Sequence, residues 1–170
     1  MTDLRTARML TRYTLWADRV MFDAVAALPP GEPEKERKTL FKSMIGTLNH
    51  NLVVDLIWQA HVERREHGFA ARNAVLHPDL AGLREAQGKM DAWWIAWADA
   101  QSPASLAERL AFSFIGGPES VMTAGEMMLH VVTHKSYHRG WVAEMFFHVP
   151  TRPPAMDLPV FLRDVRRDWE

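Results

Sequence analysis

The apolar positions of this chain repeat with helical spacing over long stretches that prolines and glycines separate. Residues 3–28 carry the first stretch, and the prolines that cluster around Gly31 predict a loop after it. The second stretch, from an expected N-cap at Thr39 to about Val62, is apolar around most of its circumference. That pattern predicts a helix buried between neighbours.

The middle of the chain interrupts this pattern and then resumes it. Residues 63–77 are charged and irregular, which predicts a loop or a frayed helix end, and His61, His67 and His77 are expected to be solvated. Pro78 suits the first turn of a third helix over about 78–100, because proline at that position loses no helical hydrogen bond.

The segment before the last long helix has a different pattern. Over residues 104–122 large apolar side chains alternate with small ones, and a Gly-Gly-Pro sequence follows them, which predicts a short hairpin or an extended connector. Thr123 and Glu126 match a Ser/Thr-x-x-Glu capping box and predict a helix from about residue 124 to Val149.

These elements predict an all-α fold. We expect an up-and-down four-helix bundle, with a small hairpin between the third and fourth helices. A short extra C-terminal helix over 158–168, capped by Asp157, would complete it. The length of 170 residues suits one domain, 1–170, with a sizeable core.

Composition and charge exclude several classes of partner. The formal net charge is −1 and no basic run is interleaved with aromatic residues, so we expect no nucleic-acid partner. The charged N-terminus lacks the apolar core of a signal peptide, and no apolar run approaches the ~18 residues of a membrane span. We therefore expect a cytoplasmic protein without a membrane partner.

The chain contains no cysteine. Disulfides, thiolate metal ligands and a cysteine nucleophile are therefore excluded together. Any metal site must be built from histidine and carboxylate, and any thiol chemistry must take its sulfur from a small molecule.

The candidate chemistry lies in the last long helix, where His130, His134 and His138 follow one another at intervals of four. Four residues advance a helix by about 1.1 turns, so the imidazoles share one stripe, which also carries apolar residues. His130 and His138 are about 12 Å apart along the axis, so a single metal ion would use His134 with one of them. The alternative is a set of core histidines bonded to hydroxyls, carbonyls or water.

A third ligand must come from a neighbouring helix, and His50 is the best candidate because it lies in the middle of the second, buried helix. Three histidines would leave a coordination position for water, which favours a catalytic over a structural centre. No His-Glu-x-x-His pattern supplies a general base, so the catalytic residues are unknown. Haem binding by two histidines would leave the third without a role.

Three stretches together resemble one family over nearly the whole chain. They are YTLWADRVMFDAVAAL in the first helix, TLNHNLVVDLIW around His50, and LHVVTHKSYHRG in the fourth helix. In order and spacing they are similar to the DinB/YfiT-like family of metal-dependent four-helix-bundle proteins, which often dimerise. The resemblance implies that His50, His134 and His138 bind a divalent metal ion, zinc or nickel, and that His130 only neighbours the site.

The resemblance also has implications for the function. It implies a metal-dependent enzyme acting on a small molecule, either an S-transferase that uses a low-molecular-weight thiol as cosubstrate or a hydrolase that uses metal-bound water. The alternative is a non-catalytic metal- or ligand-binding stress-response protein, and a homodimer is expected in each case. Two positions depart from the family pattern: Trp141 stands where glutamine is frequent, and Asp18 where asparagine is frequent. Both weaken analogies to the substrates of relatives.

Overall fold

The computed structural model describes residues 2–165 and 167. This part of the chain is mostly helical, with 6 α-helices, one 3₁₀ turn and a two-stranded antiparallel hairpin. In chain order, the elements are α1 Leu4–Ala26, α2 Met44–Val62, α3 Leu80–Asp99, α4 Pro103–Leu106, β1 Arg109–Ser113, β2 Glu119–Thr123, α5 Ala124–Met145, η1 Phe146–His148 and α6 Leu158–Asp164.

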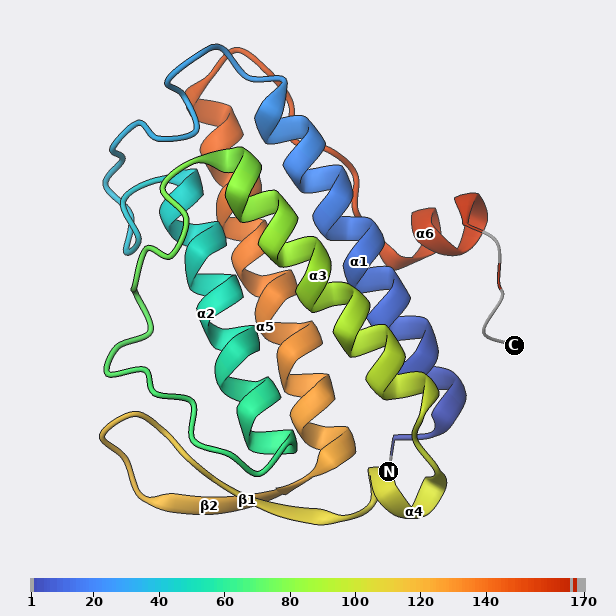
Figure 1. Cartoon of the computed structure of the whole chain (residues 1–170). Helices are drawn as coiled ribbons and strands as arrows, with labels where there is room; N and C mark the ends of the chain where they lie inside the picture. The colour runs from blue at the N-terminus through green and yellow to red at the C-terminus, as the bar shows by residue number, and fades with distance from the viewer. Residues whose placement is uncertain (1, 166, 168–170) are drawn as a thin grey trace.

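The four long helices lie side by side around a shared core (Figure 1). α1 packs against α3 and α5, and α2 packs against α5 and α3. The hairpin lies across one end of the helices, where β1 contacts α2 and β2 contacts α5, and α6 lies against α1 (Figure 1). Large buried apolar side chains from all four helices fill the interior, among them Met21, Phe22, Leu48, Leu52, Leu83, Trp94, Met127 and Val142.

The start predicted for α2 is wrong. The helix begins at Met44, and its cap is Ser43, whose hydroxyl accepts a hydrogen bond from the Gly46 backbone amide at 2.9 Å. Residues 39–42 form turns instead, and Lys42 has a φ of 65°. A Cβ at Gly46 would lie 2.1 Å from the Phe41 carbonyl oxygen, so this close approach requires glycine.

The start of α3 is also displaced from the prediction. Asp79 is its cap and accepts a hydrogen bond from the Gly82 amide at 2.8 Å, so Pro78 precedes the helix and does not occupy its first turn. The predicted loop over 63–77 is confirmed, because none of these residues belongs to a helix or a strand and the segment holds only short turns, at 63–64 and 72–73, and bends.

The hairpin and the start of α5 are confirmed. β1 and β2 pair with Leu110 opposite Met122, and Thr123 and Glu126 form both bonds of the capping box. α5 ends at Met145 rather than Val149, because the chain tightens there into the 3₁₀ turn.

The last helix is shorter than expected. It ends at Asp164, Val165 is extended, and Asp157 precedes the helix without a capping bond from its side chain. The remainder of the predicted helix falls partly on residues 166 and 168–170, which lie outside the described residues. None of the helices described is both long and apolar enough to cross a membrane.

Candidate metal centre

Three of the predicted site residues meet in space. His134 and His138 project from α5 toward His50 of α2, and one nitrogen atom from each ring lies within 4.8 Å of the others. The Nε2 atoms of His50 and His134 are 3.1 Å apart. The ring centroids are separated by 4.9, 4.6 and 4.4 Å around the triangle. Neutral imidazoles arranged in this way could hold a divalent ion.

The tautomer of His50 is set by a backbone contact. Its Nδ1 lies 2.8 Å from the carbonyl oxygen of Arg72, and because a carbonyl only accepts, Nδ1 must carry the proton. In the neutral ring Nε2 then holds a lone pair, which points toward His134. A histidine ligand oriented by a backbone carbonyl is typical of metal sites.

His134 and His138 each have a buried nitrogen without a hydrogen-bond partner among the described residues, the Nδ1 atom in both cases. Burial, together with the charges that His138 and His50 would carry, lowers the pKa of His134 to about 2. Burial likewise lowers the pKa of His138 to about 4 and moves that of His50 downward. The three rings are therefore neutral at physiological pH, which is the form that binds metal.

Aromatic side chains enclose this cluster. The Phe41 ring stacks on His50 at 4.1 Å between centroids, and Trp141 meets His138 edge-on at 4.6 Å. Trp141 is one of the two positions that depart from the family pattern, and here it forms part of the wall beside a candidate ligand. Apolar walls reduce the local dielectric, so they strengthen the interaction of the site with charge.

His130 remains outside the group of three. Its ring centroid is 5.6 Å from that of His134 and 4.5 Å from that of Trp58. The expectation that His61, His67 and His77 are solvated is only partly correct, because each is half-buried. His61 packs edge-on against Trp58 at 5.4 Å.

Comparison with known proteins identifies the family. The model of the DinB family matches residues 1–167. The chain belongs to the DinB family. No curated protein matches the chain. Membership and the three-histidine cluster both fit metal binding, while His50, His134 and His138 as actual ligands remain a prediction.

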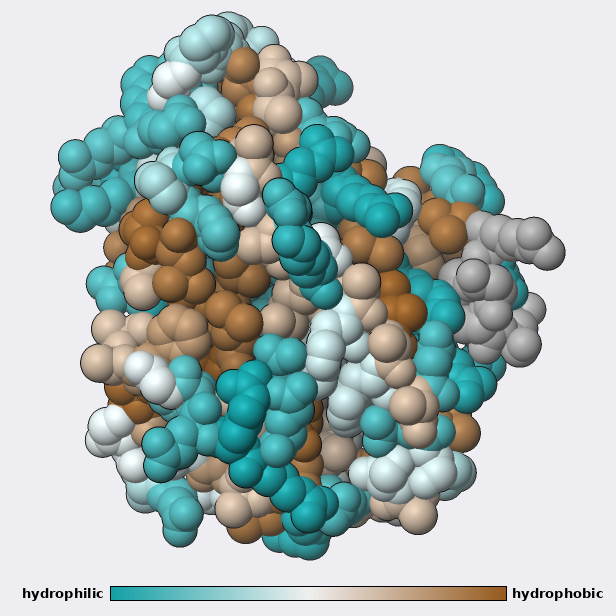
Figure 2. Space-filling view, viewed as in Figure 1, coloured by the Kyte–Doolittle hydropathy of each residue, from teal (hydrophilic) through white to brown (hydrophobic). Residues whose placement is uncertain are grey.

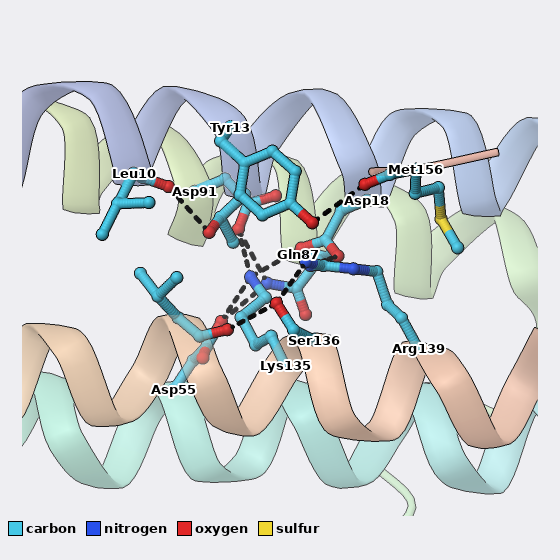
Figure 3. A network of polar contacts seen from close by, with 12 residues as sticks. Leu10, Tyr13, Asp18, Asp55, Gln87, Asp91, Lys135, Ser136, Arg139 and Met156 are labelled. Atoms are coloured by element: carbon cyan, nitrogen blue, oxygen red, sulfur yellow. Dashed lines mark hydrogen bonds and ion pairs between the residues drawn. The ribbon is translucent and has the colours of Figure 1, made fainter. Parts of the chain in front are cut away.

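This DinB protein also contains a buried charge network that the sequence analysis did not identify (Figure 3). The Lys135 ammonium lies 2.6 Å from Asp18 and 2.9 Å from Asp55, and it also contacts Asp91. Arg139 donates to Asp18 at 2.7 Å. The network therefore joins α1, α2, α3 and α5, and each of these five side chains is at most 4 % exposed.

Three carboxylates face two cations in this network, so full ionisation would leave one buried negative charge in excess. Burial is the main reason that the pKa of Asp91 is raised to about 7. The charges of Asp18 and Asp55 also raise this pKa, whereas the charge of Lys135 lowers it. Burial raises the pKa of Asp55 as well. For Lys135 burial opposes the charged form, but the carboxylates outweigh it and hold the pKa of the amine above its ordinary value. The cluster therefore retains a proton near neutral pH.

One signal in the sequence could have located this network. Lys135 and Arg139 are four residues apart on a helix whose remaining surface is largely apolar, and Asp55 lies within the apolar stretch of α2. Buried charges are almost always paired, so these residues required partners on neighbouring helices. Which partners they take depends on the packing of the helices.

Proposed function

We propose that this DinB protein binds one divalent metal ion, zinc or nickel, through His50, His134 and His138. The observation that carries the proposal is the convergence of three neutral imidazoles from two helices, with ring nitrogens within 4.8 Å of one another. The 3.1 Å approach of the Nε2 atoms of His50 and His134 supports it, because neutral imidazole nitrogens are the ligands that zinc and nickel accept. The packing of the four long helices supports an up-and-down four-helix bundle as the scaffold.

We infer that the protein is a metal-dependent enzyme acting on a small molecule, and that S-transfer from a low-molecular-weight thiol is the leading reaction. A divalent cation supplies Lewis acidity that favours the deprotonated form of a thiol or of water. Among the described residues no carboxylate joins the histidine cluster. A reaction that needs no protein general base fits this environment better than hydrolysis does, since a thiol ionises far more readily than water.

In such a transfer the thiol loses its proton, its sulfur bonds to an electrophilic carbon, and the leaving group departs with the bonding electron pair. The chain itself would orient the ligands through the His50–Arg72 contact and limit access of water through Phe41 and Trp141. Hydrolysis remains the second reaction class. The same lack of a base also favours the alternative of a non-catalytic metal- or ligand-binding stress-response protein.

Metal content of protein purified without an affinity tag tests the binding proposal. We expect about one zinc or nickel ion per chain, and a loss of affinity of at least ~100-fold in each of His50→Ala, His134→Ala and His138→Ala. His130→Ala is the matched control, because its ring lies on the same helix but outside the group of three. A site that His130→Ala empties while His138→Ala does not would overturn the ligand assignment.

Activity is tested with the metal-loaded protein. A panel of electrophiles is offered with glutathione, cysteine or coenzyme A, and activated esters are offered without thiol. Thiol-dependent product that the His134→Ala variant fails to form supports S-transfer, and ester cleavage without thiol supports hydrolysis. Absence of both reactions, with metal bound, supports the non-catalytic alternative.

We also propose that two copies of the chain form a homodimer. Figure 2 shows apolar surface gathered on the side where the segment 63–79 runs along α2, and in that segment Val75 is 59 % exposed and Leu76 is 37 % exposed. Exposed apolar patches commonly mark interfaces. Light scattering at tens of micromolar should give twice the 19.5 kDa chain mass, and a value of one chain mass would contradict the dimer.

A further inference from the structure

A small pocket lies directly beside the candidate metal centre, and His134 is part of its lining. Its volume is about 70 Å³. Its apolar walls come from α2 and the hairpin: Val54, Ile57, Trp58, Phe114 and Ile115. Since a water molecule takes about 30 Å³ in the liquid, the pocket suits the end of a small molecule and not a whole cofactor.

Arg72 supplies the charge at this pocket. Arg72 is an exposed residue that lines the cavity together with His130 and His134, and its carbonyl oxygen is fixed by the 2.8 Å contact with His50. Within residues 2–165 and 167 no carboxylate pairs with its guanidinium, whereas the neighbouring Arg64 and Arg65 pair with Glu108 and Glu63. Arg72 is close enough to disfavour protonation of both His50 and His134 through its charge.

The positive charge of Arg72 at this position disfavours the binding of a metal ion when no anion is bound with it. A divalent ion on three neutral imidazoles retains its full positive charge, and Arg72 adds charge of the same sign nearby. Like charges in a partly apolar environment repel more strongly than they do in water. An anion between Arg72 and the histidine cluster would convert this repulsion into two attractive interactions.

We propose that the pocket binds a small organic anion, whose carboxylate contacts Arg72 and whose short apolar chain packs against Ile57, Trp58 and Phe114. This inference rests on the proposed function, since it names the substrate class of the same site. The planar guanidinium suits a carboxylate because it can donate two parallel hydrogen bonds. The apolar walls select for a hydrocarbon body over a strongly hydrated one.

Butyrate and its neutral analogue butyramide test the charge requirement by calorimetric titration of the zinc-loaded and the metal-free protein. We expect butyrate to bind at least ~10-fold more tightly than butyramide in both forms. The series acetate, butyrate and octanoate tests the pocket. Affinity should rise from acetate to butyrate and gain nothing further at octanoate, since the cavity is too small. Equal binding of butyrate and butyramide, or no dependence on chain length, would overturn the proposal.

Variants locate the binding site. In the metal-free protein, where no ion attracts the carboxylate, Arg72→Gln should abolish the preference for butyrate and Arg72→Lys should retain part of it. Arg65→Gln is the control because its side chain is exposed on the same segment but does not line the pocket. Unaltered preference in Arg72→Gln would refute the assignment. Failure of zinc to bind, with anion preference intact in the metal-free protein, would reject the proposed function alone.

Discussion

Two polar regions meet the interior of this protein on adjacent faces of one helix, and they differ in how their polar atoms are satisfied. His134 and His138 face α2 with uncharged rings and unpartnered nitrogens, whereas Lys135 and Arg139, about 100° further around α5, are paired with carboxylates. Each charged group of the network is paired within the chain, although the Oδ1 atom of Asp55 accepts no hydrogen bond from the described residues. The three histidine rings instead meet without a carboxylate among the described residues, and this is the physical argument that a ligand from outside belongs there.

The largest effect should follow from opening the charge network. Lys135→Met removes the ammonium from three buried carboxylates, and breaking a buried pair costs about 3–5 kcal/mol of unfolding free energy. Urea denaturation of the metal-free protein at pH 7.5 measures it. The control Lys89→Met breaks only an exposed pair with Glu85 and should cost less than about 1 kcal/mol. Similar losses in the two variants would show that the network does not stabilise the fold.

The histidine cluster should govern the response to acid. The pKa values of His134 and His138, about 2 and about 4, lie below the value of about 6.5 expected in the unfolded chain. The unfolded state therefore binds more protons between pH 6.5 and 4, and the metal-free protein should lose on the order of 2 kcal/mol across that window. Urea midpoints at pH 7, 6, 5 and 4 check this. In the double variant His134→Asn/His138→Asn, which lacks both rings, the urea midpoint should fall less as the pH decreases.

The stability that the charge network contributes should change with pH in the opposite direction. The pKa of Asp91, about 7, lies above the value of about 3.8 of an unfolded aspartate, so the folded state binds the extra proton between these pH values. Its contribution to stability is complete below about 3.8 and is lost as the pH rises through about 7. Asp91→Asn imitates the protonated form, so it should lie within about 1 kcal/mol of the parent at pH 7.

One experiment can separate these two opposite pH dependences of the unfolding free energy. Without the Asp91 proton to offset the histidines, Asp91→Asn should lose more stability between pH 7 and 4 than the parent does, while His134→Asn/His138→Asn should lose less. If both variants lose more stability than the parent between pH 7 and 4, or both lose less, the two regions do not titrate as distinct groups.

The smallest effect concerns coupling between the regions. If the faces of α5 act independently, Asp91→Asn should change zinc affinity by no more than about threefold, because sites without shared partners combine nearly additively. Competition titration with a chromophoric chelator measures this affinity. A tenfold change would show that the network positions the ligands through α5, and that the two faces of this helix do not act independently.

Much of this architecture was readable from local sequence. The capping box at Thr123 and Glu126 and the break around Gly31 act over a few residues, so they predicted the start of α5 and a loop correctly. The spacing of four placed the histidines on one helix, and their role as ligands stays a prediction. Thr39 misled the prediction of α2 because Thr39 and Ser43 are both acceptable caps. The close approach of Gly46 to Phe41 accompanies the start at Met44.

Tertiary structure decided which polar residues meet. Periodicity places Asp18, Asp55, Asp91 and Lys135 on separate helices, but only the packing of those helices brings one ammonium to three carboxylates. The contact of Arg72 with His50 likewise joins the irregular segment after α2 to α2 itself, between residues that are 22 positions apart in the sequence. Sequence determined the helices and the chemistry that each one carries, because those depend on short-range sterics and spacing. Contacts between distant segments depend on how whole surfaces pack, and no local pattern encodes that.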